Sequence, residues 1–133
     1  MSEVTAPEFI TVRTEGDRVG VIDEPNQPAE SWGSLTYGEI AARARAQAAA
    51  LDDLGVGAGA RVAVVSQNSA RLYSQFFGVS GSGRILVPIN FRLAPEEFEY
   101  LIQHSGASVV CVDHDYLDAV DRLRPALPGG RHF

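Results

Sequence analysis

The residues best suited to chemistry stand close together near residue 111. Four of them belong to types that bind metal ions: Cys111, Asp113, His114 and Asp115. A zinc site needs several such ligands that converge in space, and closeness along the chain does not provide that. Cys111 falls in an apolar run, where a free cysteine behaves as a small buried hydrophobe. We therefore expect no metal site here, and we interpret the carboxylates as helix caps.

His104 and Ser105 form the next pair of reactive types. Adjacent residues on a helix do not face each other, so this pair cannot act as a nucleophile with its base. Three acidic residues just before them are expected to form a solvated helix face without a catalytic role: Glu96, Glu97 and Glu99.

Arg92 follows a Pro-x-Asn turn, where its guanidinium could meet a phosphate or a carboxylate. We favour a structural ion pair for it, because such arginines often serve packing.

The glycines at 55, 57 and 59 imitate a dinucleotide-binding loop. That loop follows a strand and opens a helix, whereas these glycines follow a helical pattern and precede a strand pattern. Gly78, Gly81 and Gly83 also follow a helical pattern and precede a strand pattern, so they do not match a dinucleotide-binding loop either. A nucleotide-binding Rossmann module is therefore disfavoured. No residue of the chain is assigned a catalytic, cofactor-binding or metal-binding role on these grounds.

The composition narrows the possible functions further. The chain has 133 residues, 45% of them hydrophobic, which suits one modest globular core. The net charge of -6 argues against a nucleic-acid partner. All 11 basic residues are arginine, which excludes the lysine of a phosphate loop and Schiff-base chemistry.

The single cysteine, Cys111, allows no internal disulfide. Met1–Ile10 lacks the pattern of a signal peptide, and no apolar run approaches the ~20 residues of a membrane span. We therefore expect a cytoplasmic protein without a membrane span.

The first elements are predicted from local signals. Residues 1–17 are expected to be loosely ordered. Arg18–Asp23 and Ser31–Leu35 are predicted to form a hairpin, with Trp32 as a packing anchor. Thr36 and Glu39 form a capping box that opens a long helix.

That helix carries an apolar stripe with the helical period and ends at Gly55. The stripe consists of Tyr37, Ile40, Ala41, Ala44, Ala48, Leu51 and Leu54. Leu35, before the cap, and Ile40 are placed to form a hydrophobic staple.

From there strands and helices alternate. The predicted strands are residues 61–65, 84–89 and 108–112. A helix capped by Asn68 or Ser69 separates the first two strands, and its expected inward residues are Leu72, Tyr73, Phe76, Phe77 and Val79. Gly78 and Gly81 could let this helix lie close to the sheet.

A helix beginning at Pro95 and ending at Gly106 follows, with Phe98, Leu101 and Ile102 as its buried face. Asp113 or Asp115 is expected to open a last helix with Leu117, Val120 and Leu123 inward, closed by prolines and glycines from Pro125 onward.

The predicted fold class is therefore α/β: an N-terminal hairpin, then alternating βα units that form an incomplete parallel sheet with helices on its faces. The apolar run Ile85-Leu86-Val87 suits a strand covered on both faces. It makes residues 84–89 the strand around which we expect the helices to pack.

Several stretches in a fixed order carry a resemblance to a known family. They are Leu35–Ile40, Ala50 to Val56, Gly59–Val64, Asn68-Ser69, Gly83 to Asn90, Leu93–Glu97 and His104–Ala107. Together they resemble the N-terminal part of the adenylate-forming superfamily, which includes acyl-CoA synthetases, luciferases and peptide-synthetase adenylation domains. The resemblance covers roughly residues 18–115, and its strength lies in the ordered spacing of the motifs. At Asn90 the chain resembles the acyl-CoA synthetase branch, which usually carries Asn at this position. Peptide-synthetase adenylation domains usually carry Asp there.

Two positions depart from the family pattern. Ala60 stands where Asp is usual, and Ala94 replaces a Ser or Thr helix cap, a loss of about 1 kcal/mol. The family's phosphate loop, adenine pocket, ribose-binding Asp and catalytic Lys have no counterpart here.

The resemblance implies that residues 18–133 are a partial N-terminal subdomain of an AMP-binding ligase, truncated before the phosphate loop. ATP, Mg²⁺ and CoA are implied for the full-length enzyme and none for this chain. We expect a fragment that is inactive alone, with the rest of the ligase as partner or with self-association through an exposed sheet edge. The alternative is a stand-alone, non-catalytic α/β binding or scaffolding module.

Overall fold

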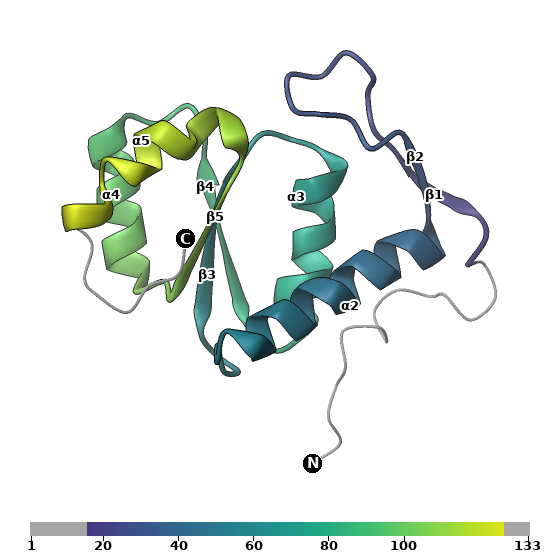
Figure 1. The fold of residues 1–133 in the computed structure, drawn as a ribbon, viewed down its shortest axis with the longest axis horizontal. Coiled ribbons are helices and arrows are strands. Elements are labelled where there is room, and N and C mark those ends of the chain that lie inside the picture. Colours follow the sequence, from purple (N-terminus) through teal and green to yellow (C-terminus); the bar gives the residue numbers. More distant parts are fainter. Residues whose placement is uncertain (1–15, 127–133) are drawn as a thin grey trace.

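The computed structural model describes residues 16–126. The expected loose start at residues 1–17 therefore lies almost wholly outside the described residues, as do the last glycines expected to close the chain's final helix. A parallel sheet stands between two helical layers (Figure 1). Helices α4 (Pro95–Ser105) and α5 (Leu117–Asp121) cover one face, and α2 (Tyr37–Asp53) and α3 (Ala70–Gln75) cover the other. A small antiparallel hairpin lies beside the N-terminal end of α2 (Figure 1).

The hairpin pairs β1 (Val19–Ile22) with β2 (Ser34–Thr36). Strand β1 lies within its predicted range, whereas β2 begins at Ser34 rather than at the predicted Ser31. Trp32 packs on the buried cluster that contains Leu35 and Ile40. The guanidinium of Arg43 lies 3.9 Å from the centre of its ring. The prediction of a packing anchor at Trp32 is confirmed.

Asp23 is a buried carboxylate that fixes the hairpin loop to the rest of the chain. Its Oδ1 accepts from the N–H of Ala70 at 2.9 Å, and its Oδ2 accepts from the N–H of Trp32 at 2.9 Å. Two buried backbone donors, 38 residues apart by number, are thus satisfied by one side chain.

Helix α2 (Tyr37–Asp53) begins with the predicted capping box. Thr36 Oγ1 accepts from the N–H of Glu39 at 3.2 Å, and Glu39 Oε2 accepts from the N–H of Thr36 at 2.8 Å. The backbone hydrogen bond from Thr36, aided by its hydroxyl, lowers the pKa of Glu39. Most of the predicted stripe is buried, but Leu54 caps the helix and is 44% exposed.

The parallel sheet contains β3 (Arg61–Ser66), β4 (Ile85–Asn90) and β5 (Val109–Val112) in the order β4-β3-β5. The expectation that residues 84–89 form the central strand is wrong. Strand β3 is central, while β4 has β3 on one side only among the described residues, and its Ile85 is 51% exposed.

Strand β3 is buried on both faces. Val62 and Val64 pack with residues of α2 and of the helix after β3. Ala63 and Val65 pack with residues of α4 and α5 on the other face. Successive side chains of a strand point to opposite faces, so one apolar run serves two cores.

The second helix has two parts, α3 (Ala70–Gln75) and a π-helical turn, η2 (Phe76–Ser80). Ser69, one of the two predicted caps, accepts from the N–H of Leu72. The predicted inward set is correct for Val79, which is fully buried, but Tyr73 and Phe76 are 40% and 47% exposed. The π-turn changes the helical period from Phe76 onward, whereas Tyr73 lies before it in α3.

Gly78 lies against helix α2 rather than against the sheet. A Cβ atom placed on it would lie 2.9 Å from Gln47 Cβ, 3.1 Å from the carbonyl oxygen of Ala44, and closer still to Gln47 Oε1. The expected close approach is therefore real, but its partner is a helix.

Helix α4 (Pro95–Ser105) buries Phe98 and Ile102 and ends at Gly106, which is left-handed at φ 63°. Glu97 Oε2 accepts from the N–H of Ala94 at 2.8 Å, so half of a capping box survives without the hydroxyl. The predicted last helix is split into η3 (His114–Tyr116), α5 (Leu117–Asp121) and η4 (Arg124–Ala126).

Replacing Gly78 by Ala tests the α2–η2 contact. We expect Gly78→Ala to lower the free energy of unfolding by about 1–3 kcal/mol, because the added methyl group overpacks the contact with Gln47 and Ala44. Urea unfolding measures this. Gly57→Ala is the control, because a Cβ there meets nothing within 4 Å and it should cost little. Equal effects of the two changes would contradict the proposed contact.

Candidate functional site

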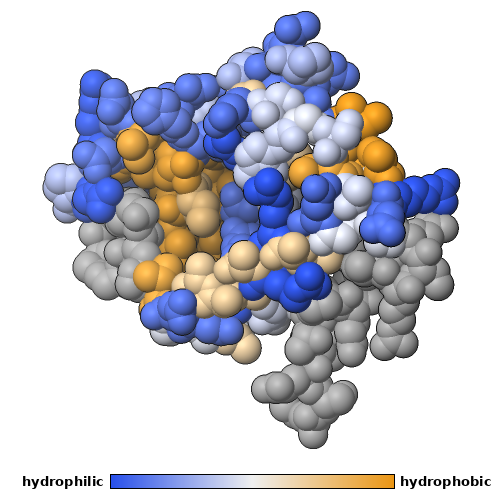
Figure 2. Space-filling model, turned by 45° about the vertical axis from the view of Figure 1, so that its right-hand side comes forward, coloured by the Kyte–Doolittle hydropathy of each residue, from blue (hydrophilic) through white to orange (hydrophobic). Residues whose placement is uncertain are grey.

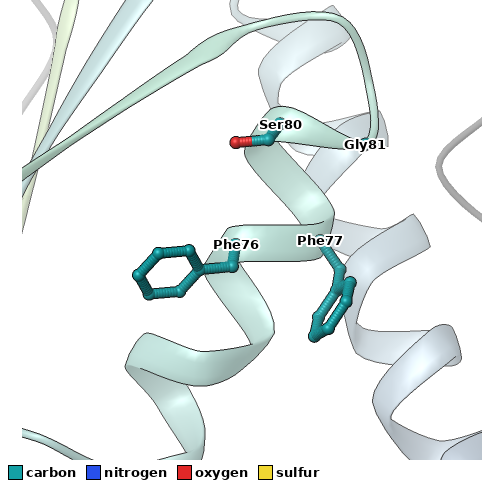
Figure 3. A pocket seen from close by; sticks show the side chains of 4 residues that line it. All are labelled: Phe76, Phe77, Ser80 and Gly81. Carbon is teal, nitrogen blue, oxygen red and sulfur yellow. The ribbon is translucent and has the colours of Figure 1, made fainter. Parts of the chain in front are cut away.

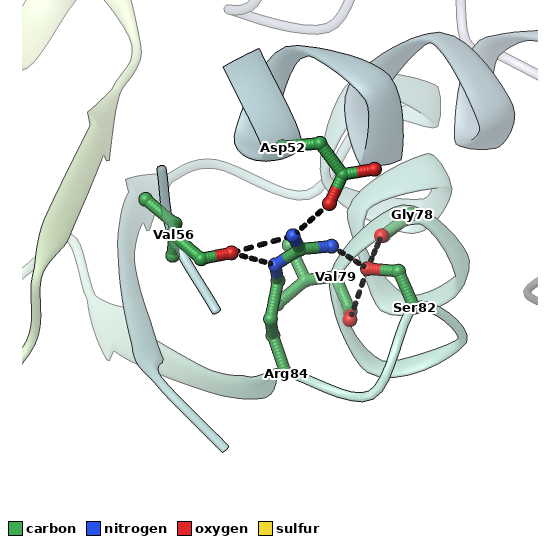
Figure 4. Close-up of polar contacts among 6 residues, drawn as sticks. All are labelled: Asp52, Val56, Gly78, Val79, Ser82 and Arg84. Atoms are coloured by element: carbon green, nitrogen blue, oxygen red, sulfur yellow. Dashed lines mark hydrogen bonds and ion pairs between the residues drawn. The ribbon is translucent and has the colours of Figure 1, made fainter. Parts of the chain in front are cut away.

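Arg84 is the most conspicuous buried charge, at 6% exposure. Its Nε donates to the carbonyl of Val56 at 2.9 Å, and Nη2 donates to the same carbonyl at 2.5 Å. Nη1 donates to Ser82 Oγ at 2.8 Å, and Nη2 also meets Asp52 Oδ1 at 2.5 Å (Figure 4).

Each nitrogen of this guanidinium already has a partner, so the Arg84 cluster is closed to a ligand. It joins the end of α2, the loop before β3 and the turn before β4. The sequence predicts Arg84 only as the first residue of a strand. Its partners lie 28 and 32 residues away along the chain, apart from nearby Ser82, and no local signal indicates them.

A small groove of about 200 Å³ lies at the π-turn, lined by Phe76, Phe77, Ser80 and Gly81. The two phenylalanine rings point to different sides of the helix (Figure 3). Its exposed lining is almost entirely apolar, and it offers few polar groups to orient a ligand. Figure 2 shows that hydrophobic surface also emerges in patches on the face drawn there.

The chain reverses its direction across the sheet after β4. From β3 it passes through α3 and η2 to β4 on one side of β3, and from β4 it passes through α4 to β5 on the other. The two connections lie on opposite faces of the sheet (Figure 1). In open α/β sheets, ligands bind at the carboxyl ends of strands at such a switch point.

A crevice of about 420 Å³ lies at this point. We call it the switch-point crevice. It is lined by Ser66, Asn68, Leu72, Pro88, Ile89, Asn90, Phe91 and Arg92. Its walls combine hydroxyl and amide groups with one guanidinium, on an apolar floor.

Arg92 is exposed, and among residues 16–126 no carboxylate forms an ion pair with it. The favoured prediction of a structural ion pair is therefore wrong. The Arg92 guanidinium lies 5.3 Å from the ring centre of Phe91. The backbone N–H of Arg92 donates to Asn90 Oδ1 at 3.0 Å. The turn at Asn90 thus holds a cation at the crevice with which no acidic residue in the described part of the chain forms an ion pair.

The carboxylate of Asp113, at this end of the sheet, forms structural hydrogen bonds. Asp113 Oδ2 accepts from Ser66 Oγ at 2.5 Å and from the N–H of Gln67 at 3.1 Å. These bonds join the ends of β3 and β5. Asp113 stands at the N-cap of η3, as predicted, but its side chain forms no capping hydrogen bond.

The other candidate residues are dispersed. Cys111 lies in β5, where burial raises the pKa of its thiol. His104 stacks on Tyr100, while Ser105 Oγ donates to the carbonyl of Ile102. The three glutamates diverge: Glu96 is exposed, Glu97 caps α4, and Glu99 accepts from Gln103.

Gly55 and Gly59 occupy left-handed turns on either side of Gly57. They connect α2 to β3, the order opposite to that of a phosphate-binding loop.

The arrangement can hold an anion, with one guanidinium and several amide and hydroxyl groups near it. Over residues 16–126 no cluster of three metal-binding side chains is present. No helix in that range is long and apolar enough to cross a membrane.

Comparison with known proteins gives consistent matches. A family model described as "AMP-binding enzyme" matches residues 10–131. A long-chain-fatty-acid–CoA ligase of Thermus thermophilus is 38% identical over 98 residues, which is 74% of this chain and 18% of that protein. A 4-hydroxybutyrate–CoA ligase of Metallosphaera sedula is 39% identical over 85 residues, 64% of this chain and 16% of that protein.

The fold is also similar to solved structures. A benzoate CoA ligase from Burkholderia xenovorans matches with a TM-score of 0.83 at 27% identity, over 96% of this chain and 24% of that one. The chain spans less than a fifth of the length of the curated relatives named above.

Arg84→Lys tests whether the planar guanidinium is needed. Lysine keeps the charge but cannot donate two hydrogen bonds to the Val56 carbonyl and one to Ser82 in the same geometry. We expect a loss of about 2 kcal/mol in the free energy of unfolding, measured by urea titration. Asp52→Asn should cost less than about 1 kcal/mol, because that carboxylate is 72% exposed. A lysine variant as stable as the unchanged chain would show that charge alone suffices.

Proposed function

Because the chain belongs to the AMP-binding enzyme family, we propose that it forms the N-terminal scaffold of an AMP-forming acyl-CoA ligase. The observation that carries this proposal is the family match over residues 10–131, nearly the whole chain. The relatives named above are CoA ligases of fatty, hydroxy and aromatic acids, so a carboxylic acid is the proposed substrate class.

The proposed reaction of the full-length enzyme has two steps. A carboxylate oxygen of the acid attacks the α-phosphorus of ATP, and pyrophosphate leaves, giving an acyl-adenylate. The sulfur of CoA then attacks the acyl carbon, its proton is lost, and AMP leaves with the electrons of the broken C–O bond. Magnesium enters this scheme as the counterion of ATP, and this chain is proposed to bind neither alone.

The chain's own part is positional. It contains no lysine, so the lysine-dependent steps of the family are proposed to belong to the rest of the ligase. We infer that residues 18–133 act as a partial subdomain whose catalytic partner is the remainder of a ligase, in the cytoplasm. Large apolar side chains are exposed on several elements: Val19, Ile22, Leu54, Tyr73, Phe76, Ile85, Tyr100 and Leu117.

Arg92 gives the scaffold one proposed role in binding. ATP, CoA and the acid are all anionic, and Arg92 is the cation at the switch-point crevice. Its guanidinium is proposed to attract an anionic group of a substrate, while Asn90 fixes the turn that presents it.

The isolated chain should not catalyse the first step. We expect no acid-dependent exchange of labelled pyrophosphate into ATP above a blank, with fatty and aromatic acids supplied with Mg²⁺. The Thermus thermophilus ligase serves as the positive control. Clear exchange by the purified chain would refute the scaffold proposal.

A chimera tests the scaffold itself. The matched segment of the Thermus thermophilus ligase would be replaced by that of this chain, and exchange and thioester formation measured. We expect activity to be retained, because the chain supplies an equivalent scaffold. A folded but inactive chimera would contradict the proposal.

Arg92→Ala within that chimera tests the crevice. We expect kcat/KM to fall about 10-fold or more for the substrate whose anion Arg92 meets, through loss of a charged hydrogen bond worth about 1.5–3 kcal/mol. Arg45→Ala, an exposed arginine of α2, is the matched control and should change little. If both variants behave alike, Arg92 has no binding role, while the scaffold proposal stands.

A further inference from the structure

The outer edge of β4 has an alternation that can be deduced from its hydrogen bonds to β3. The N–H of Ile85 donates to the carbonyl of Ala60, which lies on the β3 side. Every second residue of a parallel strand directs its N–H and C=O toward the same neighbour. In the observed register, the backbone N–H and C=O groups of residues 85, 87 and 89 therefore point toward β3. The backbone groups of Leu86, Pro88 and Asn90 point to the outer edge.

Pro88 is the middle one of these three outward residues. Proline has no N–H, so it costs β4 no hydrogen bond to β3, and its side of the strand has no partner among residues 16–126. An incoming strand would find donors at Leu86 and Asn90 but none between them. The carbonyl facing Pro88 would be left unpaired, and the proline ring would stand in its way.

The rest of this edge favours pairing. Strand β4 is six residues long, and Ile85 at its start is 51% exposed. Two such edges related by a two-fold axis would match donor to acceptor and shield both isoleucines. A second copy of the chain carries the same edge, which has no partner strand among residues 16–126, so a second copy is the partner that β4 must avoid.

We propose that Pro88 guards the outer edge of β4 against pairing with a second copy of this chain. This role is separate from any ligand at the crevice, although Pro88 also forms part of its lining. The inference does not depend on the proposed ligase function.

Amide hydrogen exchange of the unchanged chain checks the orientation first. The N–H groups of Val87 and Ile89 should exchange at least 10-fold more slowly than those of Leu86 and Asn90, because only the former face β3. Equal protection along the strand would overturn the proposal.

Pro88→Val then tests the guard, since valine restores the donor and favours strands. Sedimentation velocity over a concentration series should show dimers forming at 10-fold or more lower concentration than for the unchanged chain. Pro95→Ala, at the start of α4, is the proline control and should leave association unchanged. Pro88→Ala provides a second variant if the valine change disturbs folding, which a urea titration would reveal.

A compensating change makes the test specific to the edge. In the Pro88→Val background, Asn90→Pro removes the next outward donor without touching a bond to β3. It should return association toward that of the unchanged chain. Association that equals the unchanged level in Pro88→Val and Pro88→Ala, or that persists fully in the double variant, would overturn the proposal.

Discussion

The fold depends on the burial of strand β3 on both faces and its pairing on both edges. An apolar side chain is therefore required at every position from Val62 to Val65, where exposure is 1% or less. Because β3 comes first and lies in the centre, the chain must place β4 on one side and then cross to reach β5. Right-handed connections in opposite directions put the helices on opposite faces. The switch-point crevice is thus a consequence of where β3 lies.

The sequence predicts those features of the fold that depend on residues close together along the chain. Thr36, Glu39 and Gly55 mark the ends of α2 because capping and left-handed termination act within a few residues. The sheet order was not predictable in the same way, because Ile85-Leu86-Val87 and the run in β3 are both apolar. Pro88 is the one signal that distinguishes them, since proline within a strand indicates an edge.

Local sequence patterns do not predict hydrogen bonds between distant segments, nor whether Arg92 forms an ion pair. Asp23 reaches Ala70 across 47 residues, and Asp113 reaches Ser66 across 47. An arginine also acquires an ion pair only if the fold brings an acid to it, and the carboxylate of Asp113, which follows β5, accepts hydrogen bonds from Ser66 and Gln67 instead.

The absence of lysine has a structural counterpart. Arginine side chains donate to backbone carbonyls at loops: Arg84 donates to Val56 with two nitrogens, and Arg61 donates to Ser105 through Nε at 2.8 Å. Arg43 stacks on Trp32. A planar guanidinium serves these places through directed donors and a flat face, neither of which an ammonium group offers.

The guard at Pro88 and the exposed aromatic residues act on different kinds of contact. A missing N–H obstructs main-chain pairing along β4, but it does not prevent side-chain packing on Tyr73 or Phe76 of the neighbouring helix. Any element that covers this region in a larger ligase would therefore bind mainly through apolar side chains, and its geometry would be set by helix packing rather than by strand register. Specific packing would remain possible while indiscriminate strand addition is suppressed, which is the balance an open sheet requires to stay in solution.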